Sequence, residues 1–120
     1  MNPNDRPAVG ELAAHRTIDL TTHGRRSGRP SRIEIWWFHV DERFFITGTP
    51  GARDWYANAT ADPNVVIHVG EHDLPAVATP VRDPALRARV FDDPQTRWYS
   101  SQAQRQRLID ESPMVEITLR

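Results

Sequence analysis

Apolar and polar residues alternate over several short segments of the chain, and this period of two is typical of β-strands with one buried face. The strongest such segment is residues 33–40 (IEIWWFHV). Residues 17–22 and 114–119 also alternate, and three further segments are predicted strands: residues 43–47 as a hairpin partner, residues 65–69 as a buried strand and residues 74–82 as an extended strand. The prolines within residues 74–82 favour an edge position for that strand. Together the segments predict a mainly β fold, a small six-stranded, closed or partly closed antiparallel barrel.

Helical signals fall between these strands. Residues 53–61 are expected to form a short helix, which Asp62-Pro63 ends. Asp-Pro pairs at 83–84 and 93–94 each place a capping aspartate before a proline at the first helical position. They predict one helix that reaches about residue 92 and another that reaches about residue 110. The fold should therefore carry two or three short helices.

The composition narrows the class of protein. A chain of 120 residues has room for one domain, residues 1–120, in which we expect residues 1–14 to form an arm with one helical turn near residues 11–15. Fifteen basic residues nearly balance 16 acidic ones, so there is no overall electrostatic case for nucleic acid. Cysteine is absent, which excludes disulfides and thiolate metal sites. Without a membrane-length apolar run or a secretory signal, a cytoplasmic protein is expected.

A basic loop between the first two predicted strands is the first candidate site. All 15 basic residues of the chain are arginines, and residues 24–32 concentrate four of them with two serines and no acidic residue: Arg25, Arg26, Arg29, Arg32, Ser27 and Ser31. Glycines in the loop let the backbone turn and expose N–H groups, so the segment suits a phosphate or polycarboxylate. The alternative is a solvated loop that is basic by chance. As a nucleic-acid site its footprint would be small.

Aromatic residues form the second group of candidates. Neighbours in a strand face opposite sides, so Trp37 shares a face with Ile33 and Ile35, and Trp36 lies on the face of Glu34. One tryptophan is therefore expected in the core, while the other either walls a planar cofactor or contributes to packing or a subunit interface.

The segment after the third strand places Trp55 and Asn58 three residues apart on one helix face, where they cap a ring system or simply dock the helix. Tyr99, on the late helix, lines a pocket or packs on the barrel. The five histidines do not show the spacing of a helical zinc site, and no metal is expected.

The order of these segments is more specific than any one of them. Residues 20–30 (LTTHGRRSGRP), the loop at residues 48–51 (GTPG), residues 54–58 (DWYAN) and residues 61–65 (ADPNV) together resemble the deazaflavin-dependent nitroreductase family. That family belongs to the flavin and deazaflavin oxidoreductases, whose fold is a split β-barrel of the FMN-binding, pyridoxamine-phosphate-oxidase-like type. The resemblance covers about residues 17–70.

The resemblance implies coenzyme F-420, an 8-hydroxy-5-deazaflavin with a phosphodiester and a polyglutamate tail, and hydride transfer from it to a quinone, nitro or activated-alkene acceptor. Three groups of residues match the segments that hold this cofactor in the family. Arg25, Arg26 and Ser27 match the segment at its anionic part, and Arg32, Ile35 and Trp36 the strand beneath its ring. The two segments that close over it correspond to Thr47, Gly48 and Thr49, and to Trp55, Tyr56 and Asn58. Tyr56 and Tyr99 are the candidate proton donors.

Three departures from the family pattern bear on the activity. Pro50 stands where members often have a lysine, and the following loop is shorter, so Arg53 would have to supply that charge. The late helix lacks the paired tyrosines of some members, and Ser101 and Gln104 lie near those positions. Glu34 adds a carboxylate near the expected ring. The alternatives are the same barrel with FMN or haem, or a binding or dimerisation protein whose cofactor site has decayed. A homodimer through the Trp36 face is also consistent with the sequence.

Overall fold

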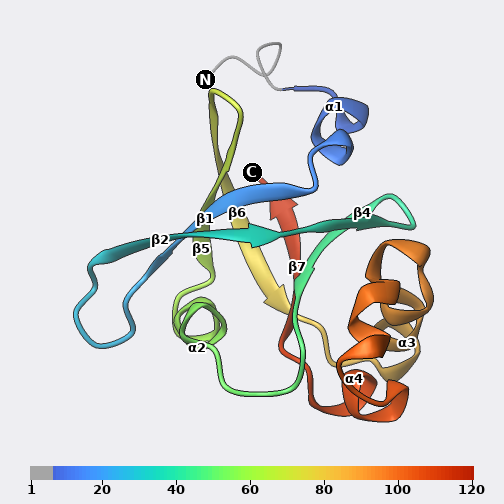
Figure 1. Ribbon diagram of the computed structural model, residues 1–120. Helices are drawn as coiled ribbons and strands as arrows, with labels where there is room; N and C mark the ends of the chain where they lie inside the picture. Colours follow the sequence, from blue (N-terminus) through green and yellow to red (C-terminus); the bar gives the residue numbers. More distant parts are fainter. Residues whose placement is uncertain (1–6) are drawn as a thin grey trace.

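One antiparallel sheet of seven strands forms the centre of the computed structural model, which describes residues 7–120 (Figure 1). In chain order its strands are β1 (Thr17–His23), β2 (Pro30–Trp36), β3 (Phe38–Val40), β4 (Arg43–Thr47), β5 (Asn64–Val69), β6 (His72–Pro80) and β7 (Met114–Leu119). They lie in the sheet in the order β2-β1-β5-β6-β7-β4-β3. The sheet is curled, as the prediction of a partly closed barrel requires.

The predicted strand at residues 33–40 is two strands, so the sheet has seven strands rather than the six expected. The break falls at Trp37. Its backbone N–H still donates to Arg16 O (3.1 Å), and its indole Nε1 donates to His15 O (2.8 Å). The ring stacks on Phe44 with centroids 4.2 Å apart. At Trp37 the chain therefore stops pairing with β1 and begins to pair with β4. The local hydrophobic pattern does not predict this change of partner.

The position of β6 corrects a second prediction. It lies between β5 and β7 and not at an edge. Pro75 pairs with Val66 of β5 but precedes the β7 ladder, which begins at Ala76. Pro80 is the last residue of β6. Arg120 N donates to Pro75 O (3.0 Å), so the backbone of Pro75 faces the β7 side, just before that ladder begins. Pro80 faces the β5 side, beyond the end of the β5 ladder at Val77. The missing N–H of each proline therefore interrupts neither ladder, so an inner strand tolerates them.

Five helices precede or connect the strands: α1 (Val9–Ala14), α2 (Asp54–Ala61), α3 (Pro84–Asp92), the 3-10 helix η2 (Pro94–Ser101) and α4 (Arg105–Glu111) in the described residues. As predicted, Asp83 caps α3, because its Oδ1 accepts from Ala85 N (3.0 Å). Leu12 of α1 is buried, whereas residues 1–6 of the predicted arm lie outside the described part of the chain.

The single late helix expected at residues 94–110 is instead η2 followed by α4. Ser100 Oγ donates to Arg97 O (2.6 Å), and Ser101 Oγ donates to Trp98 O (2.7 Å). These hydroxyls compete for the carbonyls that would continue the helix, which explains the interruption.

Two hydrophobic cores result from this arrangement. The first fills the curl of the sheet and includes Ile18, Trp37 and Ile67, with Ile33 and Ile35 packed against it, as the predicted face of Trp37 requires. The second includes Phe38, Phe45 and Leu108 and lies under α3, η2 and α4, which gather beside β4 (Figure 1). Because β4 is buried on both faces, it lacks the polar alternation of a half-buried strand.

Candidate functional site

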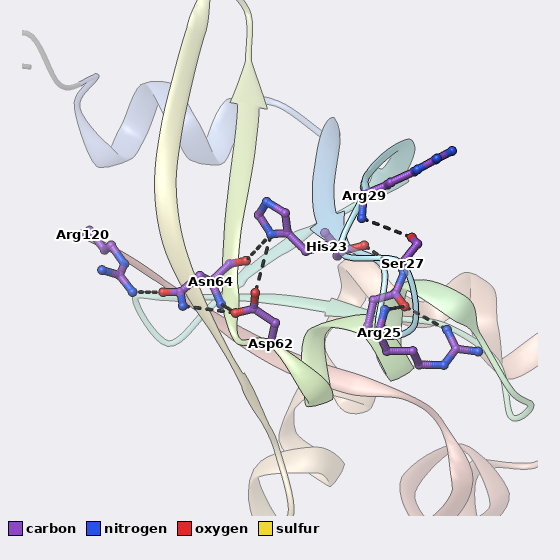
Figure 2. A network of polar contacts seen from close by, with 9 residues as sticks. His23, Arg25, Ser27, Arg29, Asp62, Asn64 and Arg120 are labelled. Atoms are coloured by element: carbon purple, nitrogen blue, oxygen red, sulfur yellow. Dashed lines mark hydrogen bonds and ion pairs between the residues drawn. The ribbon is translucent and has the colours of Figure 1, made fainter.

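The basic loop between β1 and β2 is folded tightly on itself. Gly24 N donates to Arg29 O and Gly28 N to Gly24 O, both at 2.8 Å. Gly28 has a φ of +72°, a conformation that favours glycine. A Cβ at Gly24 would lie 2.8 Å from Ser27 Oγ, which also accepts from Arg29 N at 3.2 Å. Figure 2 shows this turn from close by. The glycines therefore allow the compact turn that positions the arginines.

Asn58 of α2 anchors this loop to the barrel. Its Oδ1 accepts hydrogen bonds from Arg25 N (3.1 Å) and Arg25 Nη1 (2.8 Å), and its Nδ2 donates to Thr22 Oγ1 (3.3 Å). The Asn58 side chain is buried, although amides are seldom buried unless they are hydrogen-bonded. Arg25 Nη2 is also 3.3 Å from Asp54 at the start of α2. Residues 25 and 58, which are 33 positions apart in the chain, thus form one unit.

A hollow of about 380 Å³ lies between the loop and α2. Its lining residues are Gly24, Arg25, Arg26, Ser27, Ser31, Asp54 and Asn58. Four of the residues predicted to bind a cofactor are therefore brought together here. Two guanidinium groups and two hydroxyls face a single carboxylate, so the lining is rich in hydrogen-bond donors and carries a net positive charge.

Where β1 enters the loop, a polar network fastens the end of the strand (Figure 2). His23 Nδ1 is 3.4 Å from Asn64 O and 3.8 Å from Asp62 Oδ2. The Asn64 backbone N–H and side-chain amide both donate to Asp62 Oδ1, at 3.1 Å each, and Arg120 donates to Asn64 Oδ1. The Asn64 backbone amide, with its side chain, lowers the pKa of Asp62. The network ties β1, β5 and the C-terminal residue together.

The predicted residues of β2 face different surroundings. Arg32 Nε donates to Asp19 Oδ2 (2.8 Å), whereas Ile35 packs against the barrel core. Trp36 is 39% exposed, and its ring centroid lies 5.7 Å from that of Trp98, which is 54% exposed. Sequence reasoning did not pair these two tryptophans, because they are 62 residues apart and nothing local connects them.

Residues after β4 form a loop that is closed by Arg53. Its Nη2 donates to Thr49 O (3.2 Å) and Thr49 Oγ1 (3.0 Å), and its Nη1 donates to Ala52 O (3.1 Å). A Cβ at Gly48 would lie 3.9 Å from Arg53 Nη2. Thr47 is buried, and its Oγ1 donates to Pro113 O (2.7 Å). The Thr47 hydroxyl is therefore engaged within the protein.

The remaining aromatic candidates occupy three different environments. Trp55 is buried in the barrel core and holds α2 in place, with an edge-to-face contact to Tyr56 at 5.8 Å. Tyr56 itself is half-buried. Tyr99 is buried in the second core, where its OH donates to Thr47 O (3.3 Å) and burial raises its pKa above the ordinary 10.0. Its phenol consequently stays protonated around neutral pH.

The family model of the F420H(2)-dependent quinone reductases matches residues 2–118. The chain belongs to this family. The resemblance found in the sequence is thereby confirmed at the level of the family. A search of curated proteins gave no match.

Solved structures similar to this family member show its fold. A protein described as a candidate pyridoxamine 5′-phosphate oxidase from Listeria innocua has a TM-score of 0.70 at 12% identity, over 93% of this chain and 90% of its own. An F420-H2 dependent reductase, FDR-A, has a TM-score of 0.64 at 17% identity, over 87% and 95%. A domain-swapped dimer has a TM-score of 0.63 at 17% identity, over 92% and 91%. The predicted split barrel of the pyridoxamine-phosphate-oxidase type is thus confirmed.

Two kinds of feature are absent from the part of this quinone reductase family member that the structure describes. Within residues 7–120, no three histidine, aspartate or glutamate side chains come close enough together to hold a metal ion. In the same residues, no helix has the length and apolar character needed to cross a membrane.

Proposed function

We propose that the protein transfers a hydride from reduced coenzyme F-420 to a quinone, nitro or activated-alkene acceptor. The observation that carries this proposal is the donor-rich hollow of Arg25, Arg26, Ser27 and Asn58 in a chain of the quinone reductase family.

The donor set of the hollow fits the anionic part of the cofactor. A phosphodiester with a polyglutamate tail needs several charge-assisted hydrogen bonds, and arginine guanidiniums and hydroxyls provide them. Asp54 is the one carboxylate in the lining, and Arg25 Nη2 is within 3.3 Å of it. Asn58 holds the Arg25 backbone and side chain before any ligand arrives, so little ordering cost remains for binding.

In the proposal, the exposed Trp36 ring supplies the apolar wall for the deazaflavin ring, next to Trp98. Trp55 acts indirectly, since its burial fixes α2 and with it Asn58. When bound, the cofactor supplies the hydride chemistry, and the protein orients the reactants and excludes water. Thr49 is held by Arg53 at the loop that would cover the ring.

An acceptor that takes a hydride then needs a proton, and two tyrosines are candidates to provide it. Tyr99 already donates its OH to Thr47 O, so it serves better as a support of the β4 end. Tyr56 is half-buried and has no hydrogen-bond partner for its hydroxyl among the described residues. We therefore favour Tyr56 as the donor.

Binding of F-420 can be tested by fluorescence titration, with FMN as the parallel ligand. We expect the double variant Arg25→Glu, Arg26→Glu to weaken F-420 binding by about a hundredfold or more, because two charge-assisted contacts become repulsive. The matched control is Arg16→Glu, Arg97→Glu, which changes the same charge at exposed arginines elsewhere and should bind like the parent.

Equal F-420 affinity in the parent and the Arg25, Arg26 variant would contradict the placement of the tail. Tighter binding of FMN than of F-420 would replace the cofactor but keep the barrel. If the folded protein bound neither, the decayed-site alternative would be correct.

A further inference from the structure

A second hollow lies on the opposite side of α2 from the loop hollow. It has a volume of about 540 Å³. Asp54 and Asn58, four residues apart, line the loop hollow, whereas Arg53 and Tyr56, three residues apart, line the larger one. Helical periodicity places Tyr56 on a different face of α2 from Asp54 and Asn58, and Arg53 directly precedes the helix. The two hollows are therefore distinct sites.

Three arginines line the larger hollow, and none of them has a carboxylate partner within residues 7–120. They are Arg53, Arg82 and Arg87. Other arginines of the chain do form such ion pairs, for example Arg89 with Asp41 at 3.0 Å. The lining also holds Asp110 and Glu111, so its net charge is positive, and such a concavity attracts an anion from solution.

Arg87 is the innermost of these charges. Only 8% of it is exposed, and its Nη1 donates to Val81 O (2.8 Å) while Nε and Nη2 donate to Ile109 O and Ser112 O. Those three bonds join the end of β6 to the end of α4. A guanidinium has five N–H groups, so two of them have no partner here. Burial lowers the pKa of Arg87, but an arginine keeps its charge, and buried charges are usually paired.

The carboxylates in the wall have partners of their own. Asp110 accepts two hydrogen bonds from Gln106 Nε2 (3.0 and 3.1 Å), and Glu111 pairs with Arg107 at 2.8 Å. Ser112, by contrast, is 4% exposed, and its Oγ has no hydrogen-bond partner in the described chain. A buried hydroxyl without a partner is costly unless a ligand or water completes it.

We propose that this hollow binds an oxyanion, a phosphate or carboxylate group of a small molecule. Arg87 and Ser112 provide the inner donors, Arg53 and Arg82 the outer charges, and the Tyr56 ring lines the side. As a site for a separate metabolite the hollow is independent of the cofactor, whereas as a site for the tail of the cofactor it rests on the proposed function. The oxyanion belongs either to a separate metabolite or to the acidic tail of the cofactor.

The test is a titration of the ¹⁵N-labelled protein with inorganic phosphate, followed by the amide shifts of Arg82 and Ser112. We expect saturable shifts at both. Arg82→Gln, a change at an exposed position, should weaken binding about tenfold, the effect of one charge-assisted contact. Arg97→Gln, also at an exposed arginine without an ion pair in the described chain, is the matched control and should not change the affinity. Arg87 is not substituted, because its hydrogen bonds join β6 to α4. The second variant is Ser112→Ala, which should also weaken phosphate binding.

Three results would overturn the proposal: no saturable shift at Arg82 and Ser112, an unchanged affinity in Arg82→Gln, or shifts confined to residues 24–29. The Arg25→Glu, Arg26→Glu protein separates this site from the loop hollow, since it should lose F-420 and keep phosphate. Titration with F-420 then identifies the source of the anion. Shifts of Ser112 on cofactor binding would assign the hollow to the tail, and additive binding of phosphate and F-420 would assign it to a separate metabolite.

Discussion

Trp36 and Trp37 are neighbours in the chain with opposite surroundings. Trp37 is 1% exposed, stacks on Phe44 and donates to a backbone carbonyl, whereas Trp36 is exposed beside Trp98. The period of two in a strand predicted this difference correctly. It could not predict the partners, because Phe44 and Trp98 reach these rings through the fold and not through local sequence.

We expect Trp37→Ala to lower the free energy of unfolding by about 3–5 kcal/mol, because it removes a fully buried aromatic side chain. Trp36→Ala should lower it by about 1 kcal/mol or less, the scale of one exposed aromatic contact. Urea denaturation of the two variants measures both values. Equal losses would mean that the junction of β2 and β3 does not depend on the buried Trp37 ring.

At the scale of the residue, the sequence predicted which residues form the anion-binding loop but not the polar contacts that hold it. The glycines and arginines of residues 24–32 predicted an anion-binding loop, and four predicted site residues do share one hollow. The role of Asn58 as its anchor was not predicted, nor was the buried position of Arg87. Both depend on hydrogen bonds between segments that are distant in the chain, and residue type alone does not indicate them.

At the scale of elements, local signals were reliable where the cause is local. The Asp83 cap, the end of α2 and the strands β4, β5 and β7 follow from short patterns. The division at Trp37 and the inner position of β6 do not follow from short patterns, because they depend on which strands lie next to each other in the sheet. An edge strand and an inner strand can have the same composition when the prolines fall at the ends of the ladders.

The connection between the basic loop and α2 leads to a prediction about elements. Asn58→Ala removes the acceptor of the Arg25 backbone N–H and of Arg25 Nη1. We expect the amide of Arg25 to exchange with solvent at least about tenfold faster, since a lost hydrogen bond of about 1.4 kcal/mol changes the opening equilibrium by that factor. Hydrogen exchange followed by NMR measures it, with the amide of Gly28, bonded to Gly24 O, as the internal reference. Unchanged exchange at Arg25 would show that the loop holds itself without α2.

For the whole molecule, three exposed carboxyls make the free energy of unfolding depend on pH in the acid range. The Asn64 amides lower the pKa of Asp62, the hydrogen bond with His68 lowers that of Asp73, and the paired contacts of Arg105, at 2.8 Å each, lower that of Asp92. Each ordinary value is 3.8. A carboxyl whose pKa is lower in the folded protein stabilises it above the unfolded value and loses that contribution as the pH falls through the folded one.

We therefore expect the melting temperature to fall as the pH is lowered through 3.8 toward the lower folded-state values. Asp92→Asn should lower the melting temperature at neutral pH and reduce its dependence on pH in this acid range, because the carboxylate of the ion pair with Arg105 is replaced by a neutral amide. Thermal denaturation at a series of pH values measures both effects. An acid profile identical to that of the parent would show that this ion pair does not contribute.

The order of strands has a mechanical consequence. β2 and β3 stand at the two ends of the sheet, and only Trp37 separates them in the chain. Between every other pair of neighbouring strands a ladder of main-chain hydrogen bonds resists separation, but at this seam the connection is covalent and the resistance comes from side-chain packing. The curled sheet is thus closed at one position without a main-chain ladder. The exposed Trp36 and Trp98 rings lie beside that position, so a flat molecule inserted there would separate side chains and break no ladder of main-chain hydrogen bonds.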